Sequence, residues 1–426
     1  MPVVAGEEIR AEDLRRITRD VPLTRGLGRA YGDAALPAAP DTRVAGSRLA
    51  DRILSFDRET GILHAEAGLP LTQIYDVFLP RGFFTPVTPG TREVTLGGMV
   101  AADVHGKNHH RDGCFGEHVV SVTLRVADGR IVTCSRSDEP ELFRATIGGM
   151  GLTGHILEVG VRLVEVPSAW ILQETLPIRD IDEFVDTLRA SSAAWPMTAG
   201  WIDCLSPGPL GRGILFRGRW AKPAEAPAVP PHSPHAVTVP MTMPEAVLRR
   251  GAVRLFNKAY YMRRARSTGH AVVDPHEFFY PLDRVRSWNR LYGPRGFVQY
   301  QCVLPYSANS DVIRRFLQRA VGRNDVFLCV IKDCGSEGLG TLSFPKPGIS
   351  LALDMPFRDQ TQSSVDDMNE FVAAEGGRIY LAKDALTRPH HYRAMDPRVD
   401  AFLCVRRKWD RDGRIRSALS TRLFGW

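Results

Sequence analysis

Three glycine clusters within the first 155 residues carry the residue types that could bind a phosphate. They are the segments 25–33 (RGLGRAYGD), 89–98 (PGTREVTLGG) and 148–154 (GGMGLTG). Glycine lets backbone N–H groups approach a phosphate closely and adopts positive φ angles. The first cluster is no GxGxxG fingerprint, because Tyr31 replaces its third glycine, and no P-loop Gly-Lys-Ser/Thr follows. One such cluster indicates only a tight turn, whereas three in succession favour a large phosphate-bearing cofactor held by loops.

The segment 103–110 (DVHGKNHH) contains three histidines within six residues. Such a group could bind a metal ion, but the only nearby acidic residues are Asp103 and Asp112. The seven cysteines also include no CxxC pair, so the sequence predicts no metal site. A lone histidine is most often structural, and His105, which precedes a glycine, could instead lie against a cofactor ring.

The composition is that of a globular protein of two or three domains. The 426 residues are 44% hydrophobic and 24% charged, and 55 Lys and Arg against 48 Asp and Glu give a net charge of +7. This surplus permits contact with anionic ligands or lipid headgroups without requiring nucleic acid. No apolar run could span a bilayer, and residues 1–10 lack the apolar core of a signal peptide. The odd number of cysteines fits reduced thiols better than a disulfide framework. Together these features predict a cytoplasmic location, and a peripheral position on the inner membrane face is an alternative.

The first 165 residues are predicted to alternate short strands with glycine turns, which is typical of an α+β fold. The predicted strands are 43–50, 61–68, 121–126 and 156–166, and the predicted helix is 71–79. Residues 222–244 are rich in proline and should form a loop or an extended connector. Residues 249–266 hold seven Lys or Arg and no acid. They could be a solvated surface segment, or they could rest on an anionic membrane or over an anionic substrate.

The second half has more regular patterns, which predict a sheet covered by helices. The predicted strands are 296–304, 326–332, 348–355 and 378–382, and the predicted helices are 311–321 and one capped by Ser363 or Ser364 and ended by Gly376-Gly377. The last of these strands would place Lys383 at a strand end.

Seven motifs in chain order together resemble a known family. They are GLGRAYGD (26–33), PGTREVTLGG (89–98), DVHGKNHH (103–110), GLTG (151–154), FVQYQ (297–301), GGRIYLAKD (376–384) and PRVD with VRRK (397–400, 405–408). They are similar to FAD-binding oxidoreductases of the vanillyl-alcohol oxidase type, and most similar to the oxidases of decaprenylphosphoryl-ribose 2′-epimerisation. The resemblance runs from about residue 21 to 408.

This resemblance implies a two-domain α+β flavoprotein. Residues 1–168 and 378–426 would form the FAD-binding domain, and residues 169–377 would form an inserted substrate domain with an antiparallel sheet covered by helices. The residues implied to bind FAD are Thr24, Arg25, Gly26, Leu27, Gly28, Arg29, Ala30, Tyr31, Gly32, Asp33, Ala34, Gly90, Thr95, Leu96, Gly97, Gly98, Ala102, Asp103, Val104, His105, Ile156 and Tyr380. The first glycine loop has no histidine for a covalent flavin bond, so FAD would be bound non-covalently.

The same resemblance implies catalytic roles for Lys383, Tyr31 and His105. Lys383 would place positive charge by the reduced flavin or bind the substrate hydroxyl, Tyr31 would orient or relay a proton, and His105 would position substrate or ring. The implied substrate residues are Lys107, Trp201, Gln299, Gln301, Lys332, Ser350, Ala352 and Lys383. Strand alternation places Gln299 and Gln301 on one face and Tyr300 on the other. The sequence departs from the family at Ala352, a cysteine in mycobacterial members, and at Ser350, where asparagine is usual.

The implied activity is FAD-dependent oxidation of the 2′-hydroxyl of a polyprenyl-phosphoryl pentose to a 2′-keto sugar. An NAD(P)H-dependent short-chain reductase would then complete the epimerisation, and residues 249–266 would contact the membrane that holds the lipid-linked substrate. One alternative is an aldonolactone or alditol oxidase of the same fold acting on a soluble sugar. Another is a basic nucleic-acid-binding protein, although no RRM, KH or zinc signature supports it.

Overall fold

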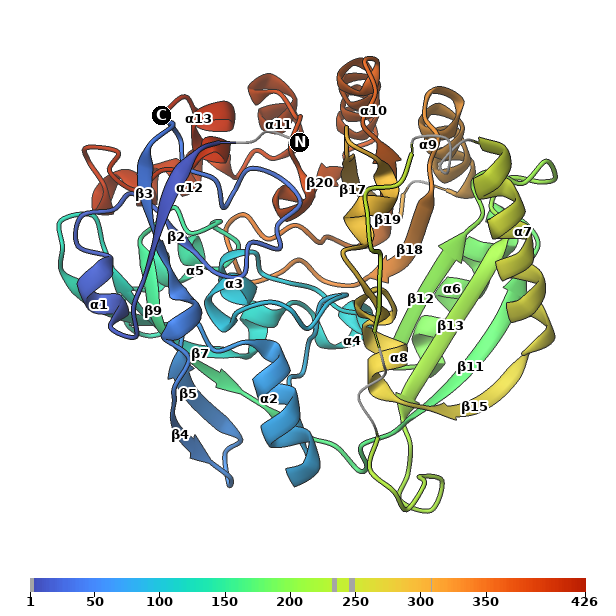
Figure 1. Cartoon of the computed structure of the whole chain (residues 1–426), viewed down its shortest axis with the longest axis horizontal. Helices are drawn as coiled ribbons and strands as arrows, with labels where there is room; N and C mark the ends of the chain where they lie inside the picture. The colour runs from blue at the N-terminus through green and yellow to red at the C-terminus, as the bar shows by residue number, and fades with distance from the viewer. Residues whose placement is uncertain (1–3, 232–235, 245–249, 308) are drawn as a thin grey trace.

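Two antiparallel sheets lie side by side and organise the molecule (Figure 1). The computed structural model describes residues 4–231, 236–244, 250–307 and 309–426. The five-stranded sheet has the order β4 (Ile53–Asp57), β5 (Ile62–Glu66), β9 (His155–Arg162), β7 (Val119–Arg125), β8 (Ile131–Ser135). The eight-stranded sheet has the order β15 (Gly269–Val273), β11 (Ile171–Ile178), β13 (Gly213–Trp220), β12 (Met197–Ile202), β18 (Leu328–Cys334), β19 (Gly348–Pro356), β17 (Phe297–Pro305), β20 (Arg378–Ile379).

Smaller sheets and short helices complete the N-terminal part. A parallel sheet contains β1 (Gly6–Arg10), β3 (Thr42–Gly46) and β2 (Thr24–Arg25), and β6 (Phe83–Phe84) pairs with β10 (Val164–Glu165). The helices here are α1 (Leu14–Ile17), α2 (Leu71–Phe78), α3 (Leu96–Ala101), α4 (His109–Asp112) and α5 (Pro140–Thr146). Strand alternation buries Leu63 and Val122, which pack with Phe143 of α5 in one core.

Helices cover one face of the eight-stranded sheet because the strand residues on that face are apolar. The covering helices are α6 (Ile181–Ala194), α9 (Ser310–Arg323) and α10 (Thr361–Ala374). The predicted stripe of α9 is confirmed, since Ile313, Phe316, Leu317 and Ala320 are all fully buried. The opposite face is approached by α7 (Arg250–Arg266) and α8 (Pro275–Phe279). None of the helices described here is long and apolar enough to cross a bilayer.

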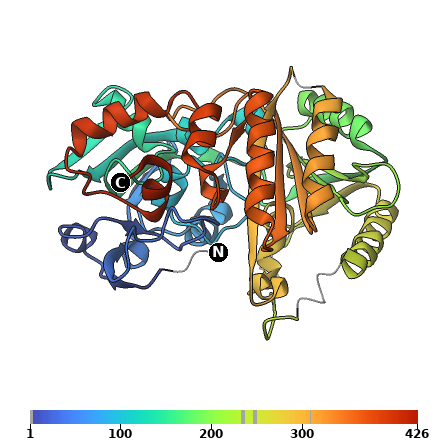
Figure 2. The same ribbon diagram turned by 90° about the horizontal axis from the view of Figure 1, so that it is seen from above.

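The C-terminal residues return to the side of the five-stranded sheet (Figure 2). After β20 come a 3-10 turn (Leu381–Lys383) and the helices α11 (Pro389–Met395), α12 (Val399–Trp409) and α13 (Ala418–Phe424). Helix α12 packs on α5. The eight-stranded sheet comes from residues 171–379, so the observed order suits an inserted unit, but the boundaries at 168 and 377 stay a prediction.

Several predicted elements need correction. Helix α10 begins at Thr361, after Gln360, so Ser363 and Ser364 lie inside it and do not cap it. The strand predicted over 378–382 has only two residues, because the chain turns sharply after Ile379. Lys383 therefore lies at the end of a 3-10 turn.

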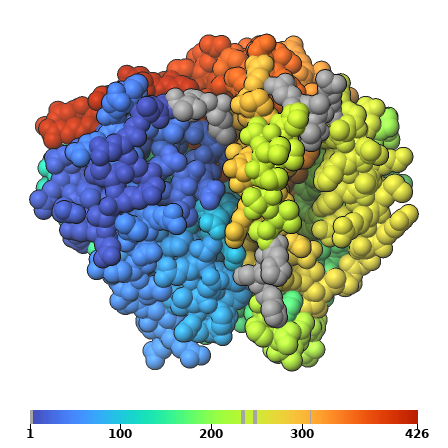
Figure 3. Space-filling model, viewed as in Figure 1, coloured from blue at the N-terminus to red at the C-terminus, as the bar shows by residue number. Residues whose placement is uncertain are grey.

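The basic segment and the proline-rich segment are described in part. The basic segment forms helix α7 from Arg250, and Arg249 lies outside the described residues. In the proline-rich segment, of which 232–235 are not described, β14 (Val237–Thr238) pairs with β16 (Val285–Arg286). The described residues 236–244 lie on the front face of the molecule, between the blue N-terminal residues and the yellow residues around α7 (Figure 3).

Candidate active site

The first glycine loop packs directly on the turn that carries Lys383. The amide of Tyr31 donates to the carbonyl of Ala382 at 2.9 Å. A Cβ atom at position 32 would overlap the carbonyl oxygen of Asp384, so only glycine allows this approach. Residues 350 positions apart in sequence therefore meet at one point.

The first and second glycine clusters also touch each other. Thr95 caps α3 by accepting from the amide of Gly98 at 3.2 Å, and a side chain at Gly26 would collide with the Thr95 hydroxyl. Arg29 bridges the same loops by donating to the carbonyl of Glu93 at 3.2 Å. Gly90 is exposed, with open space where a Cβ would stand. The first two predicted cofactor loops are therefore in contact, which is expected of loops around one large ligand.

A strained turn places His105 against the eight-stranded sheet, where its ring contacts Gln301. Asp103 is buried with φ of 40°, an unfavourable angle for a residue with a side chain. Its carboxylate accepts from the Gly116 amide at 2.8 Å and from the Ser343 hydroxyl, which stabilises the turn. Tyr380 fixes the same segment by donating to the carbonyl of Ala102 at 3.0 Å.

His105 is held neutral, and one of its ring nitrogens has no partner. The Gln301 amide donates to His105 Nε2 at 3.0 Å, which places the ring proton on Nδ1. Burial and the nearby Lys332 lower the pKa of His105 well below its ordinary value. Nδ1 is buried without a hydrogen-bond partner among the described residues. A buried N–H is costly to leave unpaired, so this atom suits a ligand that accepts a hydrogen bond.

Six of the eight residues predicted to bind substrate share one face of the eight-stranded sheet, whereas Lys107 and Lys383 lie outside its strands. The strand register forms a row in which Gln301 opposes Ala352, Ala352 opposes Val330, and Val330 opposes Trp201. In the neighbouring row Ser350 lies opposite Lys332, and the Gln301 amide also donates to the Ser350 hydroxyl at 3.0 Å. The prediction that Gln299 and Gln301 share a face is confirmed, since Tyr300 on the other face bonds to Asn369 of α10.

Asp354 is a buried carboxylate that the sequence reasoning missed. It accepts hydrogen bonds from the Gln299 amide and, at 3.3 Å, from the Tyr292 hydroxyl. Burial raises its pKa to about 6, opposed by these hydrogen bonds and by Lys383. Alternation along β19 was the available signal, because Ser350, Ala352 and Asp354 occupy every second position.

Lys383 faces this polar surface and lies beside Tyr31. Its Nζ is 4.8 Å from the centroid of the Tyr31 ring, and Lys383, Tyr380 and Gln301 line a small cavity. Burial lowers the pKa of Lys383 to about 8; Asp354 opposes that shift and Lys332 adds to it. Burial raises the pKa of Tyr31 far above its ordinary value, so its hydroxyl stays protonated. A lysine whose pKa lies near neutral pH can release or accept a proton at physiological pH.

Two further lysines make the surface cationic. Burial, together with the nearby Lys332, lowers the pKa of Lys107 to about 7. Burial also lowers the pKa of Lys332. An anionic ligand beside Lys107 and Lys332 would favour their charged forms, because an opposite charge nearby raises the pKa of an amine.

The other two histidines of the 103–110 motif point to different partners. His109 Nε2 lies 3.3 Å from the Cys114 sulfur, and His110 Nε2 bonds to the carbonyl of Trp195 at 2.9 Å. Within the described residues no group of three or more His, Cys, Asp or Glu side chains could hold a metal ion.

Comparison with known proteins identifies the type of cofactor. Residues 16–135 match the FAD binding domain family. The decaprenylphosphoryl-β-D-ribose oxidase of Mycolicibacterium smegmatis is 34% identical, over 94% of this chain and 88% of its own. The chain belongs to the decaprenylphosphoryl-β-D-ribose oxidase family. It is an FAD-dependent oxidoreductase, and the FAD binding domain match indicates the fold of vanillyl-alcohol-oxidase-type flavoproteins.

Two other relatives set the extent of the similarity. An uncharacterized protein from the mprA 5′ region of Streptomyces coelicolor is 32% identical, over 83% of this chain and all of its own. The L-gulonolactone oxidase of Mus musculus is 29% identical, but over only 32% of this chain and 30% of its own. Similarity to this oxidase family thus extends over nearly the whole chain, whereas similarity to the lactone oxidase covers about a third.

The residues on both sides of the junction fit FAD. The contacting glycine loops leave room for close backbone approach, and the unpaired Nδ1 of His105 needs an acceptor, which a flavin ring can provide. When bound, FAD supplies a hydride acceptor at this junction. Lys383, His105 and Gln301 come from three distant segments of the chain and lie together here.

Proposed function

We propose that the protein oxidises the 2′-hydroxyl of a polyprenyl-phosphoryl pentose to a 2′-keto sugar. FAD is bound non-covalently, and an NAD(P)H-dependent short-chain reductase then completes a 2′-epimerisation. The observation that carries this proposal is the similarity to a decaprenylphosphoryl-β-D-ribose oxidase over 94% of the chain. In this proposal residues 1–168 and 378–426 form the FAD-binding domain around an inserted substrate domain.

In the proposed mechanism Lys383 accepts the proton of the reacting hydroxyl. With a pKa of about 8, a substantial fraction of its Nζ is neutral under mildly basic conditions. Asp354 stabilises the ammonium that forms, because its charge opposes the depression of the lysine pKa. Tyr31 keeps its own proton and contributes its ring face and hydroxyl to positioning. His105, kept neutral by Gln301, positions the ring or substrate without adding another positive charge.

The orientation of the substrate follows from the polarity of the sheet face. The sugar lies near Gln301 and Lys383, and the phosphate lies near Lys332 and Lys107. Burial depresses the pKa of both lysines, and a bound phosphate would stabilise their ammonium forms. The polyprenyl chain follows the apolar positions from Ala352 towards Trp201. The row spans four strands, about 15 Å at the usual strand spacing.

Helix α7 is the proposed membrane contact at the end of that row. The Tyr260 ring on its inner side packs at 4.8 Å on Trp201, and Asn257 donates to Asp203 at 2.9 Å. Its outer side exposes Leu255 and Met262 between basic residues. The larger exposed side chains on this outer side include Leu255, Phe256, Lys258, Met262, Arg263 and Arg266. Apolar side chains flanked by Lys and Arg are typical of helices that lie on anionic bilayers.

An anaerobic titration tests the proposed reaction. Decaprenylphosphoryl-ribose should bleach the yellow absorption of the oxidised flavin, whereas L-gulonolactone at the same concentration should not. Bleaching by the lactone alone would favour a soluble-sugar oxidase, for which the partial similarity to L-gulonolactone oxidase is the supporting observation. Acid precipitation should release the FAD into the supernatant, and flavin retained in the pellet would contradict non-covalent binding.

A vesicle-binding assay tests the proposed membrane contact. The wild type should sediment with phosphatidylglycerol vesicles, and Leu255→Glu with Met262→Glu should weaken this binding. The matched control is Leu54→Glu, because Leu54 is similarly exposed on β4, in the other sheet. Equal loss of binding in the control would remove α7 from the proposal.

A further inference from the structure

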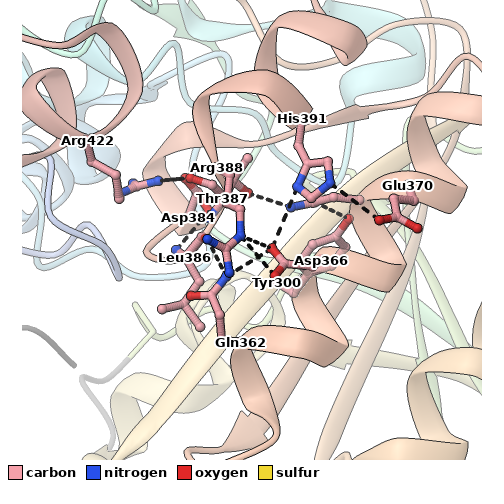
Figure 4. Close-up of polar contacts among 11 residues, drawn as sticks. Tyr300, Gln362, Asp366, Glu370, Asp384, Leu386, Thr387, Arg388, His391 and Arg422 are labelled. Atoms are coloured by element: carbon pink, nitrogen blue, oxygen red, sulfur yellow. Dashed lines mark hydrogen bonds and ion pairs between the residues drawn. The ribbon is translucent and has the colours of Figure 1, made fainter.

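Arg422 of α13 connects the two chain segments that meet at the candidate active site. Its guanidinium donates to both carboxylate oxygens of Asp33 at 2.7 and 2.8 Å. The same guanidinium lies 2.9 Å from Asp384 Oδ2 and donates to the carbonyl of Thr387 at 2.6 Å. Figure 4 shows the half of this arrangement around Asp384 and Thr387.

The two carboxylates bound by Arg422 are almost completely buried. The side chains of Asp33 and Asp384 are each 5% exposed, and that of Arg422 is 22% exposed. A buried carboxylate that loses its cation is strongly destabilised, because neither water nor another charge replaces it. The planar fork of arginine also matches the two oxygens of Asp33, which a lysine cannot do.

Each carboxylate is adjacent to a residue of the proposed chemistry. Asp33 lies two residues after Tyr31 in the first glycine loop, and Asp384 directly follows Lys383. The two segments are in backbone contact through the amide of Tyr31 and the carbonyl of Ala382. Arg422 thus holds together, from outside the site, the loop with Tyr31 and the turn with Lys383.

A chain of buried hydrogen bonds extends this connection to the substrate strand. Asp384 accepts from the amide of Thr387 at 3.0 Å, and the Thr387 hydroxyl accepts from the Asn369 amide at 3.1 Å. The Asn369 side-chain oxygen accepts from the Tyr300 hydroxyl at 2.9 Å. Tyr300 lies on β17 between Gln299 and Gln301, on the opposite face of the strand. The contacts of Tyr300, Thr387 and Asp384 belong to the cluster drawn in Figure 4.

We propose that Arg422 is a positioning residue for the oxidation, fixing the glycine loop of the cofactor site against the turn that carries Lys383. Removing its guanidinium releases Asp33 and Asp384 from each other, so the loop loosens around FAD and Lys383 loses its place beside Tyr31. The proposal rests on the proposed role of Lys383, but its first consequences concern the loops and the cofactor alone.

The test compares Arg422→Gln with Arg411→Gln, an exposed arginine that follows α12. Arg422→Gln should raise the FAD dissociation constant by about tenfold or more, since the buried pairs with Asp33 and Asp384 are both lost. Hydrogen exchange should accelerate in residues 30–34 and 382–387, with and without FAD. With substrate, kcat for flavin reduction should fall more than KM rises, because the reacting groups are misplaced. Arg422→Lys should restore only part of each effect.

The outcomes separate this proposal from the proposed function. If Arg422→Gln lowers thermal stability but leaves FAD affinity and the exchange of both segments equal to Arg411→Gln, Arg422 is only structural and the proposal fails. The same conclusion follows if Arg422→Lys equals the wild type, because the bidentate geometry is then unnecessary. If the wild type reduces no flavin with a polyprenyl-phosphoryl pentose, the proposed function fails, while FAD affinity and exchange still decide the role of Arg422.

Discussion

The two faces of the eight-stranded sheet are both buried, yet they differ in how their side chains are satisfied. Under α9 and α10 the strands present Cys302, Ile331, Leu351 and Leu353, which pack in one apolar core. On the other face the same strands present Gln299, Gln301, Lys332 and Asp354. Adjacent residues of one strand thus serve opposite purposes, because successive side chains point to opposite faces.

The difference supports the proposal that the polar face binds the ligands. The apolar face is stabilised by its own packing. On the polar face, Gln299 Oε1 is buried without a hydrogen-bond partner among the described residues. Burial also depresses the lysine pKa values there. Such groups are costly in a free protein, and a bound cofactor and substrate would satisfy them.

Removing the amine of Lys383 should have the largest effect on the polar face. Lys383→Ala should retain FAD, and its rate of flavin reduction by substrate should fall by about 10²–10⁴-fold, because a positioned proton acceptor is absent. Anaerobic stopped-flow bleaching measures this loss, with exposed Lys222→Ala as the control. Bleaching at the wild-type rate would remove Lys383 from the mechanism.

Truncating a core residue on the apolar face should lower the stability of the protein and leave flavin reduction nearly unchanged. Phe316→Ala should lower the free energy of unfolding by about 3–5 kcal/mol, because Phe316 is fully buried between sheet and helix. Flavin reduction per folded molecule should change little. Denaturant titration measures the loss, and Phe256→Ala, exposed on α7, is the control. A selective loss of flavin reduction with little loss of stability would break the proposed division between the faces.

The pH profile should distinguish proton acceptance by Lys383 from a permanently positive role. The neutral fraction of Lys383 grows as the pH rises through about 8, so flavin reduction should accelerate across that pH and then level off. Lys383→Arg should lose this dependence, because arginine stays charged. A rate that falls above pH 8 would instead favour stabilisation of the reduced flavin by the ammonium.

The same titration has a defined sign for stability. Between pH values of about 8 and 10.5 the unfolded chain binds more protons at Lys383 than the folded protein does. The contribution of Lys383 to the free energy of unfolding should therefore rise with pH across this window. The free energy of unfolding, measured by denaturant titration at several pH values, should rise more steeply between pH values of about 8 and 10.5 in the wild type than in Lys383→Ala. The same pH dependence in both proteins would contradict the depressed pKa.

Ala352 should give the smallest effect. Nitroaromatic inhibitors that trap a pocket cysteine should form no covalent adduct after turnover, because position 352 has no thiol. Intact-mass spectrometry checks this, with Ala352→Cys as the variant expected to gain the adduct. An adduct on the wild type would show that another cysteine reaches the reactive inhibitor.

Much of the local structure was predictable because it depends on periodicity. The stripe of α9 and the alternation of Gln299 and Gln301 follow from side-chain spacing alone. The start of α10 was not predictable from Ser363 and Ser364, because capping preference is weak against the packing of a whole helix. The 3-10 turn at Lys383 was also not predicted. A long-range contact with the first glycine loop shapes this turn, and local sequence patterns do not report such contacts.

By itself the sequence determined the family, the cofactor class and the residue types of the site, because these depend on short motifs in a fixed order. Only the tertiary structure decided which distant groups meet. The register of β19 with β17 places Asp354 beside Gln299, and the contact of α13 with the first glycine loop places Arg422 on Asp33. The roles proposed for Asp354 and Arg422 depend on these contacts. The physical reason is that pKa shifts and ion pairs depend on distances of a few ångströms between segments hundreds of residues apart.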